Sequence, residues 1–175
     1  MIRRRFLHPV RRRAESAIWL HRVRKMRARA PAFINEVPDA TPMLERFERH
    51  LTALLRTAQA HVGRVVLVRQ PWMGPHPSPE EEALMWNFGL GRPYREEVTT
   101  YFTPRVVDAL MTQIDARATA VADALGIQHV DVRPALGEPK GKFYDYLHFT
   151  PPGAELVGCA VAEALIAGAA PGSKE

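Results

Sequence analysis

Two short apolar runs, each standing just after a glycine that closes a long amphipathic stretch, constrain the fold of this chain most strongly. They are residues 65–68, preceded by Gly63, and residues 127–132, preceded by Gly126. A glycine commonly ends a helix, and a short run of valine, leucine and isoleucine suits a buried parallel strand. A further helix is expected after Thr150. The order helix, strand, long crossover with a helix, strand, helix predicts an α/β fold with a parallel sheet.

The length and the composition fit one domain with an apolar core. The chain has 175 residues, of which 46% are apolar and 25% are charged, and this excludes wholesale disorder, collagen and a disulfide scaffold. Cys159 is the only cysteine, so neither an intramolecular disulfide nor a cysteine-cluster metal site is expected. No signal peptide is visible, and no apolar run reaches the roughly 18 residues that cross a bilayer. The compartment is left open, with the cytoplasm as the default expectation.

Positive charge is concentrated at the N-terminus. Residues 1–30 hold 11 lysines and arginines and one acid, for a net charge of +10, whereas the other 145 residues hold 13 basic and 18 acidic residues, for a net charge of −5. Within this basic arm, Ile18, Trp19, Val23 and Met26 recur at helical spacing. The arm could contact nucleic acid or an anionic membrane surface. The other interpretation is a solvated helix, or a stretch whose natural partner surface is absent from this chain.

The sequence divides into a basic N-terminal arm with its linker, residues 1–40, and an α/β region, residues 41–170. Prolines punctuate the linker, and Thr41 is expected to cap the first helix of the α/β region. Residues 71–102 hold six of the fourteen aromatic residues and form a long excursion, in which Ser78 begins a short helix through a capping box. This excursion is either a substrate loop or lid, or the local packing of a small subcore.

Asp145 and His148 are the candidate catalytic residues. They stand three residues apart, directly before the last expected helix, and loops at the carboxyl ends of parallel strands commonly carry the site of an open α/β sheet. A carboxylate at this spacing can accept a hydrogen bond from Nδ1 of the histidine, which leaves Nε2 free as a base. The spacing also suits a simple loop hydrogen bond or a helix cap, so both interpretations stay open.

The stretch Asp145-Tyr-Leu-His148-Phe-Thr-Pro-Pro-Gly153-Ala resembles the C-terminal block of the SGNH (GDSL-type) hydrolases. Residues 51–71 are similar to a helix and the following strand of that family, and the resemblance covers about residues 43–167. It implies a partial flavodoxin-like fold, a three-layer α/β/α arrangement with a parallel sheet, here preceded by the basic helical arm.

The same resemblance implies an ester (acyl) hydrolase that works by serine acyl transfer, without a metal or another cofactor. Asp145 would orient the imidazole and His148 would be the general base. The substrate would be an ester of a small molecule, a lipid or a carbohydrate. The nucleophile of the family is a serine in a Gly-Asp-Ser block, and its oxyanion hole adds a glycine and an asparagine from two further blocks.

That nucleophile block is not present in this sequence. The three serines, Ser16, Ser78 and Ser173, have no Gly-Asp-Ser context, and neither Asn35 nor Asn87 lies in a Gly-x-Asn setting. Three explanations stay open: the reading frame starts too late, the chain is a degenerate remnant, or a second polypeptide supplies the rest. Weak or no activity on simple esters is expected. A sheet that lacks strands would also expose an edge, through which the chain could dimerise.

Other candidate sites have simpler structural interpretations. His129 and Asp131 alternate on one strand and could pair. Cys159 is expected to be a buried, inert cysteine, and Gly89 to begin a turn. Glu80–Glu82 are expected in the first turn of a helix, where the helix dipole favours acids.

The alternative function belongs to another class of protein. In it the chain is a non-catalytic α/β binding protein, and residues 1–30 dock on nucleic acid or anionic lipid. Binding that weakens steeply with ionic strength would distinguish this alternative from the hydrolase.

Overall fold

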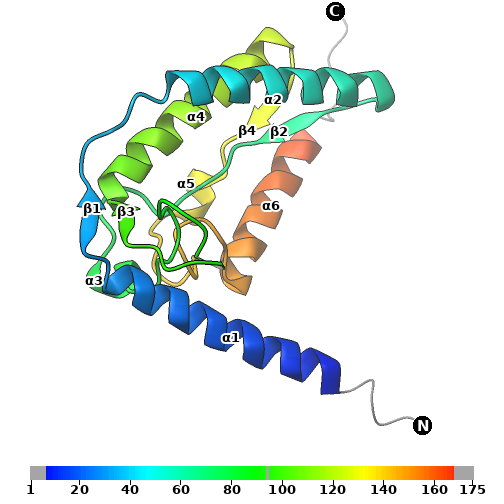
Figure 1. Ribbon diagram of the computed structural model, residues 1–175. Coiled ribbons are helices and arrows are strands. Elements are labelled where there is room, and N and C mark those ends of the chain that lie inside the picture. Colours follow the sequence, from blue (N-terminus) through cyan, green and yellow to red (C-terminus); the bar gives the residue numbers. More distant parts are fainter. Residues whose placement is uncertain (1–6, 94, 168–175) are drawn as a thin grey trace, which may run out of the picture.

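The computed structural model describes residues 7–93 and 95–167, with side chains from residue 16 onward. Its helices and strands follow one another along the chain as shown in Figure 1. They are α1 (Leu7–Ala28), β1 (Ala32–Ile34), α2 (Thr41–His61), β2 (Val66–Val68), α3 (Pro79–Glu82), β3 (Thr100–Phe102), α4 (Pro104–Ala124), β4 (Gln128–Val130), α5 (Arg133–Leu136) and α6 (Pro151–Ala167). None of the helices in this part of the chain is long and apolar enough to cross a membrane.

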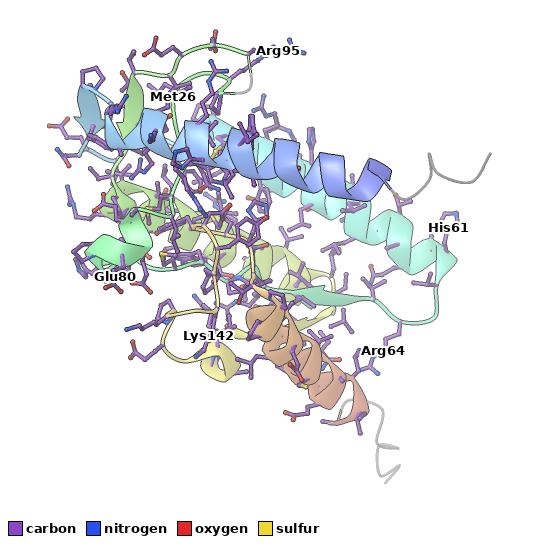
Figure 2. All side chains as sticks on the ribbon, turned by 90° about the horizontal axis from the view of Figure 1, so that it is seen from below. Met26, His61, Arg64, Glu80, Arg95 and Lys142 are labelled. Atoms are coloured by element: carbon purple, nitrogen blue, oxygen red, sulfur yellow. The ribbon has the colours of Figure 1, made fainter. Side chains whose placement is uncertain are left out.

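The two predicted strands pair in parallel and lie between helices. β2 pairs with β4, and Val66 faces Gln128 while Val68 faces Val130. Helices α2 and α4 cover one side of the pair, and α6 runs along the other (Figure 1). The end of α6 is held there, because Arg64 donates a hydrogen bond to the carbonyl of Leu165. Figure 2 shows Arg64 beside the last turn of this helix. The predicted α/β class with parallel strands is therefore confirmed.

A core cluster joins the strand pair to α2 and α4. Leu55 of α2 packs with Val121 and Ala122 of α4 and with Ile127, and all four are buried. Leu67 of β2 lies against the same cluster. The helical spacing of apolar residues in α2 and α4 predicts this contact, because it places an apolar stripe along one side of each helix, and this side faces the strands.

A second parallel pair lies where the sequence analysis placed only linker and excursion. β1 pairs with β3, in the register Phe33 opposite Tyr101. The segment before β3 adds to this pair through an antiparallel bridge between Gly89 and Tyr101. The chain bends at Leu90 and Gly91, directly after this bridge, so the turn expected to begin at Gly89 follows a strand contact that the sequence did not predict. A Cβ at Gly89 would lie 2.5 Å from Cγ1 of Val98, so the close approach of the backbone requires a glycine. Strands of three residues are too short for an alternating pattern to reveal them.

The described part of the basic arm is helical over Leu7–Ala28, and its C-terminal part packs on the rest of the chain. Val23 is fully buried, and Arg27 is only 4% exposed. The guanidinium of Arg27 lies 5.2 Å from the ring centre of Phe33 and 5.3 Å from that of Tyr101, so cation–π contacts hold it between β1 and β3. The interpretation of a wholly solvated helix is therefore wrong for this part of α1. Ile18, in contrast, is 70% exposed.

The helices begin close to the predicted residues, but their N-terminal caps differ from one helix to the next. Ser78 forms the expected capping box with Glu81. Thr41 is the first residue of α2 and not its cap, since Ala40 takes the cap position and the carboxylate of Asp39 accepts from the Thr41 N–H instead. Thr103, which the sequence Thr103-Pro104 also predicts to cap a helix, precedes α4. Its hydroxyl donates to the carbonyl of Ile34 and not to the helix, so it links α4 to β1.

The aromatic-rich residues 71–102 contribute to a second core cluster. Met73 and Met85 of this segment are buried with Val107, Leu136, Phe143 and Tyr146, and Trp72, Phe88 and Phe102 pack against them. This part of the segment is a packed subcore that lies under the loop before α6. The local-packing interpretation therefore accounts for these side chains.

Four charged side chains form a network beyond the ends of β2 and β4. Arg69 binds Asp115 through two hydrogen bonds and lies 3.2 Å from Asp131. Arg133 binds Asp131 through Nε at 2.9 Å and Nη2 at 2.7 Å. These hydrogen bonds from Arg133 are the largest cause that lowers the pKa of Asp131 below its ordinary value. Paired arginine and aspartate forks are directional, so the network fixes α4 and α5 to the strand ends.

We expect Asp131→Asn to lower the stability near neutral pH and to change little at low pH. The pKa of Asp131 is depressed in the fold, so its contribution is present above the ordinary aspartate pKa of about 4 and is lost as the pH falls through the lower folded value. The loss is about 1 kcal/mol, because the side chain is 30% exposed and solvent screens the pair. Urea unfolding at neutral and acidic pH measures it. The control is Asp123→Asn, whose carboxylate is 65% exposed; equal losses in both variants would contradict this prediction.

Candidate active site

The loop before α6 closes on itself and is fastened to the second core cluster. Phe143 and Phe149 form an antiparallel bridge, and the Tyr144 N–H donates to the carbonyl of His148 at 3.0 Å. Tyr146 points inward and is 1% exposed, and its hydroxyl donates to the carbonyl of Gly74 at 2.9 Å. The turn that carries the candidate residues is therefore closed by backbone contacts at its two ends and anchored to the core by Tyr146.

Asp145 lies at the centre of this turn, and its side chain is fully buried. Its Oδ1 accepts from the backbone N–H groups of Leu147 and His148, both at 2.9 Å. Its Oδ2 accepts from the indole Nε1 of Trp86 at 2.8 Å. A buried carboxylate needs such donors to offset its lost hydration. Because donors contact both of its oxygens, these hydrogen bonds fix the orientation of the carboxylate.

His148 lies against this carboxylate, and the structure brings the two predicted residues together. Nδ1 of His148 is 2.8 Å from Oδ2 and 3.0 Å from Oδ1 of Asp145. The carboxylate is an acceptor, so Nδ1 carries the hydrogen and the neutral ring has its lone pair at Nε2. The His148 side chain is 52% exposed, and the ring of Tyr144 stacks on it at 5.4 Å. An oriented imidazole that is open to solvent can act as a base.

Helix α1 adds two contacts that the sequence analysis did not anticipate. Trp19 packs edge-on against Trp86 with ring centres 4.9 Å apart. Arg24 donates hydrogen bonds to the carbonyls of Leu84 and Tyr144. Burial lowers the pKa of Arg24, and the nearby charge of Asp145 opposes that effect. The arm therefore braces both the tryptophan and the loop that hold Asp145.

Trp86 is the site residue that sequence reasoning missed as a partner of Asp145. The two residues stand 59 positions apart, and no local spacing connects them. The sequence signal was limited to the enrichment of aromatic residues in residues 71–102. A tryptophan in such a segment needs a partner for its N–H when it is buried, but the sequence does not reveal which acceptor it finds.

The structure places the candidate nucleophile and oxyanion residues as follows. The hydroxyl of Ser78 is used in the capping box with Glu81. Ser16 lies on α1, three residues before Trp19, and Ser173 lies outside the described residues. The side-chain oxygen of Asn87 accepts from the backbone of Trp86 at 3.5 Å. Asn35 follows β1, and its backbone carbonyl accepts from Arg105.

The structure corrects the expectations for His129 with Asp131 and for Cys159, and it agrees with the expectation for Glu80–Glu82. His129 and Asp131 do not pair: Nε2 of His129 lies 3.3 Å from Asp123, whereas the fork of Arg133 occupies Asp131. Cys159 is exposed and not buried, because α6 turns this side of the helix outward. Glu80–Glu82 lie in the first turn of α3, as expected. Within residues 7–93 and 95–167, no cluster of three histidine, cysteine or acidic side chains has the arrangement of a metal site.

Comparisons with known proteins reveal a coarse structural likeness. No protein-family model matches the sequence, and no curated protein sequence matches it. Among solved structures, the fold is similar to that of LAE5, an α/β hydrolase enzyme from the metagenome of Lake Arreo, Spain, with 19% identity and a TM-score of 0.48. The match covers 69% of this chain and 46% of the other, so it spans less than half of that protein's length. The α/β class assigned here rests on the parallel strand pairs themselves.

Proposed function

We propose that this chain carries the acid–base part of an ester (acyl) hydrolase of the SGNH (GDSL) type. The observation that supports this most is the buried carboxylate of Asp145 bound to Nδ1 of His148, an imidazole whose side chain is 52% exposed. The resemblance of residues 145–153 to the C-terminal block of that family adds to it. Esters of small molecules, lipids or carbohydrates are the proposed substrate class.

In this mechanism each residue has a separate role. Nε2 of His148 takes the proton of an attacking hydroxyl, and the imidazolium later gives that proton to the leaving alcohol. Asp145 stabilises the imidazolium and fixes the tautomer. Trp86 and the backbone N–H groups of the turn keep the carboxylate from rotating. Trp86 is therefore a positioning residue in this proposal.

No residue of this chain is assigned as the source of the attacking hydroxyl. Ser78 is occupied as a helix cap, and no Gly-Asp-Ser block is present in the sequence. A triad without its nucleophile retains little of its chemistry. We therefore expect slow hydrolysis of activated esters, in which the imidazole of His148 activates water or is itself acylated.

We expect the chain to hydrolyse p-nitrophenyl acetate slowly and His148→Ala to lose most of that rate. A complete general base contributes about 10²–10⁴-fold, so a loss of about tenfold is expected here, where the nucleophile is weak. Release of p-nitrophenolate measures the rate. The matched control is His50→Ala, which removes an exposed imidazole on α2 and should leave the rate unchanged. Equal rates in His148→Ala and the parent chain would overturn the proposal, and efficient turnover would contradict a missing nucleophile.

A further inference from the structure

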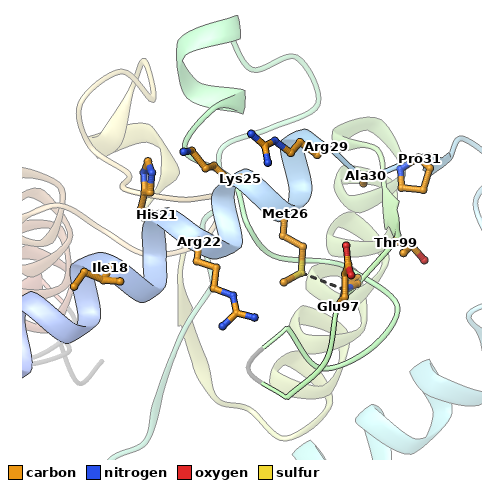
Figure 3. A pocket seen from close by; sticks show the side chains of 11 residues that line it. Ile18, His21, Arg22, Lys25, Met26, Arg29, Ala30, Pro31, Glu97 and Thr99 are labelled. Atoms are coloured by element: carbon orange, nitrogen blue, oxygen red, sulfur yellow. Dashed lines mark hydrogen bonds between the residues drawn. The ribbon is translucent and has the colours of Figure 1, made fainter.

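A groove lies between α1 and the segment that leads into β3, away from the His148–Asp145 pair. Its volume is about 480 Å³. One wall is α1, and the other is residues 97–99, with Ala30 and Pro31 at one end (Figure 3). Met26 bridges the two walls, since its sulfur accepts from the Val98 N–H at 3.2 Å. The groove is therefore a fixed feature of how α1 docks.

The described cations at the C-terminal end of α1 differ in their surroundings. Arg24 and Arg27 point inward, where they bind backbone carbonyls. Arg22, Lys25 and Arg29 are exposed and line the groove (Figure 3). Arg22 and Lys25 lie on α1 and Arg29 directly follows its last residue, and the spacing of three and four residues brings their backbone positions to one side of the helix. Glu97 is the one acid in the described lining. The groove therefore presents an excess of positive charge to solvent.

The same face also carries apolar surface. Ile18 is 70% exposed at one end of the groove, Pro31 is exposed at the other, and the half-buried Met26 lies between them. In helices that bind at a membrane interface, cations meet lipid headgroups while a neighbouring apolar side chain enters the headgroup–acyl boundary, and the exposed cations and Ile18 can act together in this way. The described lining includes no phenylalanine, tyrosine or tryptophan, the large aromatic side chains on which single-stranded nucleic acid stacks best.

We propose that this face of α1 docks on an anionic phospholipid bilayer. Arg22, Lys25 and Arg29 bind the lipid phosphates, and Ile18 inserts at the boundary. The charge of residues 1–15, which hold six further arginines, acts in the same direction. The inference does not depend on the hydrolase proposal, because none of these side chains belongs to the His148–Asp145 site.

The test is co-sedimentation of the full chain with vesicles. We expect binding to vesicles of phosphatidylcholine with phosphatidylglycerol, little binding to phosphatidylcholine alone, and a steep loss of binding as salt is raised. Each cation near an anionic surface strengthens binding by about fivefold. The variant Arg22→Gln/Lys25→Gln/Arg29→Gln should therefore bind at least about tenfold more weakly, although the six arginines of residues 1–15 remain.

A matched control removes the same charge elsewhere. Arg46→Gln/Arg49→Gln/Arg56→Gln takes three exposed cations from α2 and should bind as the parent chain does. Ile18→Gln should reduce the binding that persists at high salt. Equal losses in the two triple variants, or equal binding to neutral vesicles, would overturn the proposal. A duplex DNA bound more tightly than the anionic vesicles, and weakened by the same α1 variant, would also overturn it in favour of nucleic acid.

Discussion

Replacement of Gly153 by alanine is expected to destabilise the protein by about 3 kcal/mol, because the new methyl group would collide with backbone. An ideal Cβ at this position would lie 2.2 Å from the carbonyl oxygen of Lys142 and 3.0 Å from its carbonyl carbon. Lys142 cannot move aside easily, since the same carbonyl accepts the N–H of Thr150 at 2.9 Å. Overpacking of a well-packed site typically costs about 1–3 kcal/mol, and a clash with hydrogen-bonded backbone belongs at the upper end.

Thermal unfolding measures this effect. A loss of about 3 kcal/mol corresponds to roughly 6–12 °C in Tm for a chain of this size. The matched control is Gly158→Ala in the same helix, where a Cβ would meet nothing within 4 Å. Alanine favours a helix over glycine by up to about 1 kcal/mol, so this variant should melt at the same temperature as the parent chain or higher. Equal losses at the two glycines would contradict the packing argument.

The second large effect is expected for Asp145→Ala, with a loss of about 3–5 kcal/mol. The substitution leaves the indole N–H of Trp86 and the backbone N–H groups of Leu147 and His148 without their acceptor. An unsatisfied buried donor costs about 1–3 kcal/mol. Removal of one member of a buried charged network is among the single substitutions with the largest losses of stability. Urea unfolding measures the loss.

Asp108→Ala is the control for Asp145→Ala. Asp108 accepts from the indole of Trp72 at 2.7 Å, so this variant also breaks an aspartate–tryptophan bond but leaves the His148 loop intact. We expect a loss of about 1 kcal/mol and an unchanged rate with p-nitrophenyl acetate. A loss in Asp108→Ala as large as that in Asp145→Ala would show that Asp145 has no special place in the fold.

Asp145→Asn separates orientation from packing. It keeps the volume of the side chain and one acceptor oxygen, so that much of the stability should remain. The amide can accept from Nδ1–H only by giving up another donor, and the histidine loses its preferred tautomer. The ester rate should therefore fall to that of His148→Ala while the fold persists. A rate equal to that of the parent chain would remove Asp145 from the proposed mechanism.

Several local features could be predicted because their causes are local. The long helices α2 and α4 follow from apolar stripes at helical spacing, and the capping box at Ser78 needs only Glu81, three residues away. The expected contact between Asp145 and His148 follows in the same way, because three residues of a turn bring the carboxylate to Nδ1. In each case the partners are neighbours in the sequence.

Other features depend on residues that are far apart along the chain. β1 and β3 are three residues each and have no pattern of their own; their pairing is a long-range contact. The buried face of α1 is equally nonlocal, since Arg27 is held by the rings of Phe33 and Tyr101. Arginine spacing in the sequence indicates a charged helix, but it does not indicate which cations turn inward.

The sequence by itself determined the α/β class, the parallel strands β2 and β4, and the pairing of Asp145 with His148, because hydrogen bonding and periodicity act over a few residues. The tertiary structure alone decided that Trp86 completes the cradle of Asp145, that Asp131 binds Arg133 and not His129, and that α1 packs beside the site. Those contacts depend on which side chains the folded chain brings within hydrogen-bonding or packing distance. Trp86 and Asp145 stand 59 positions apart in the sequence, and no local signal indicates their contact.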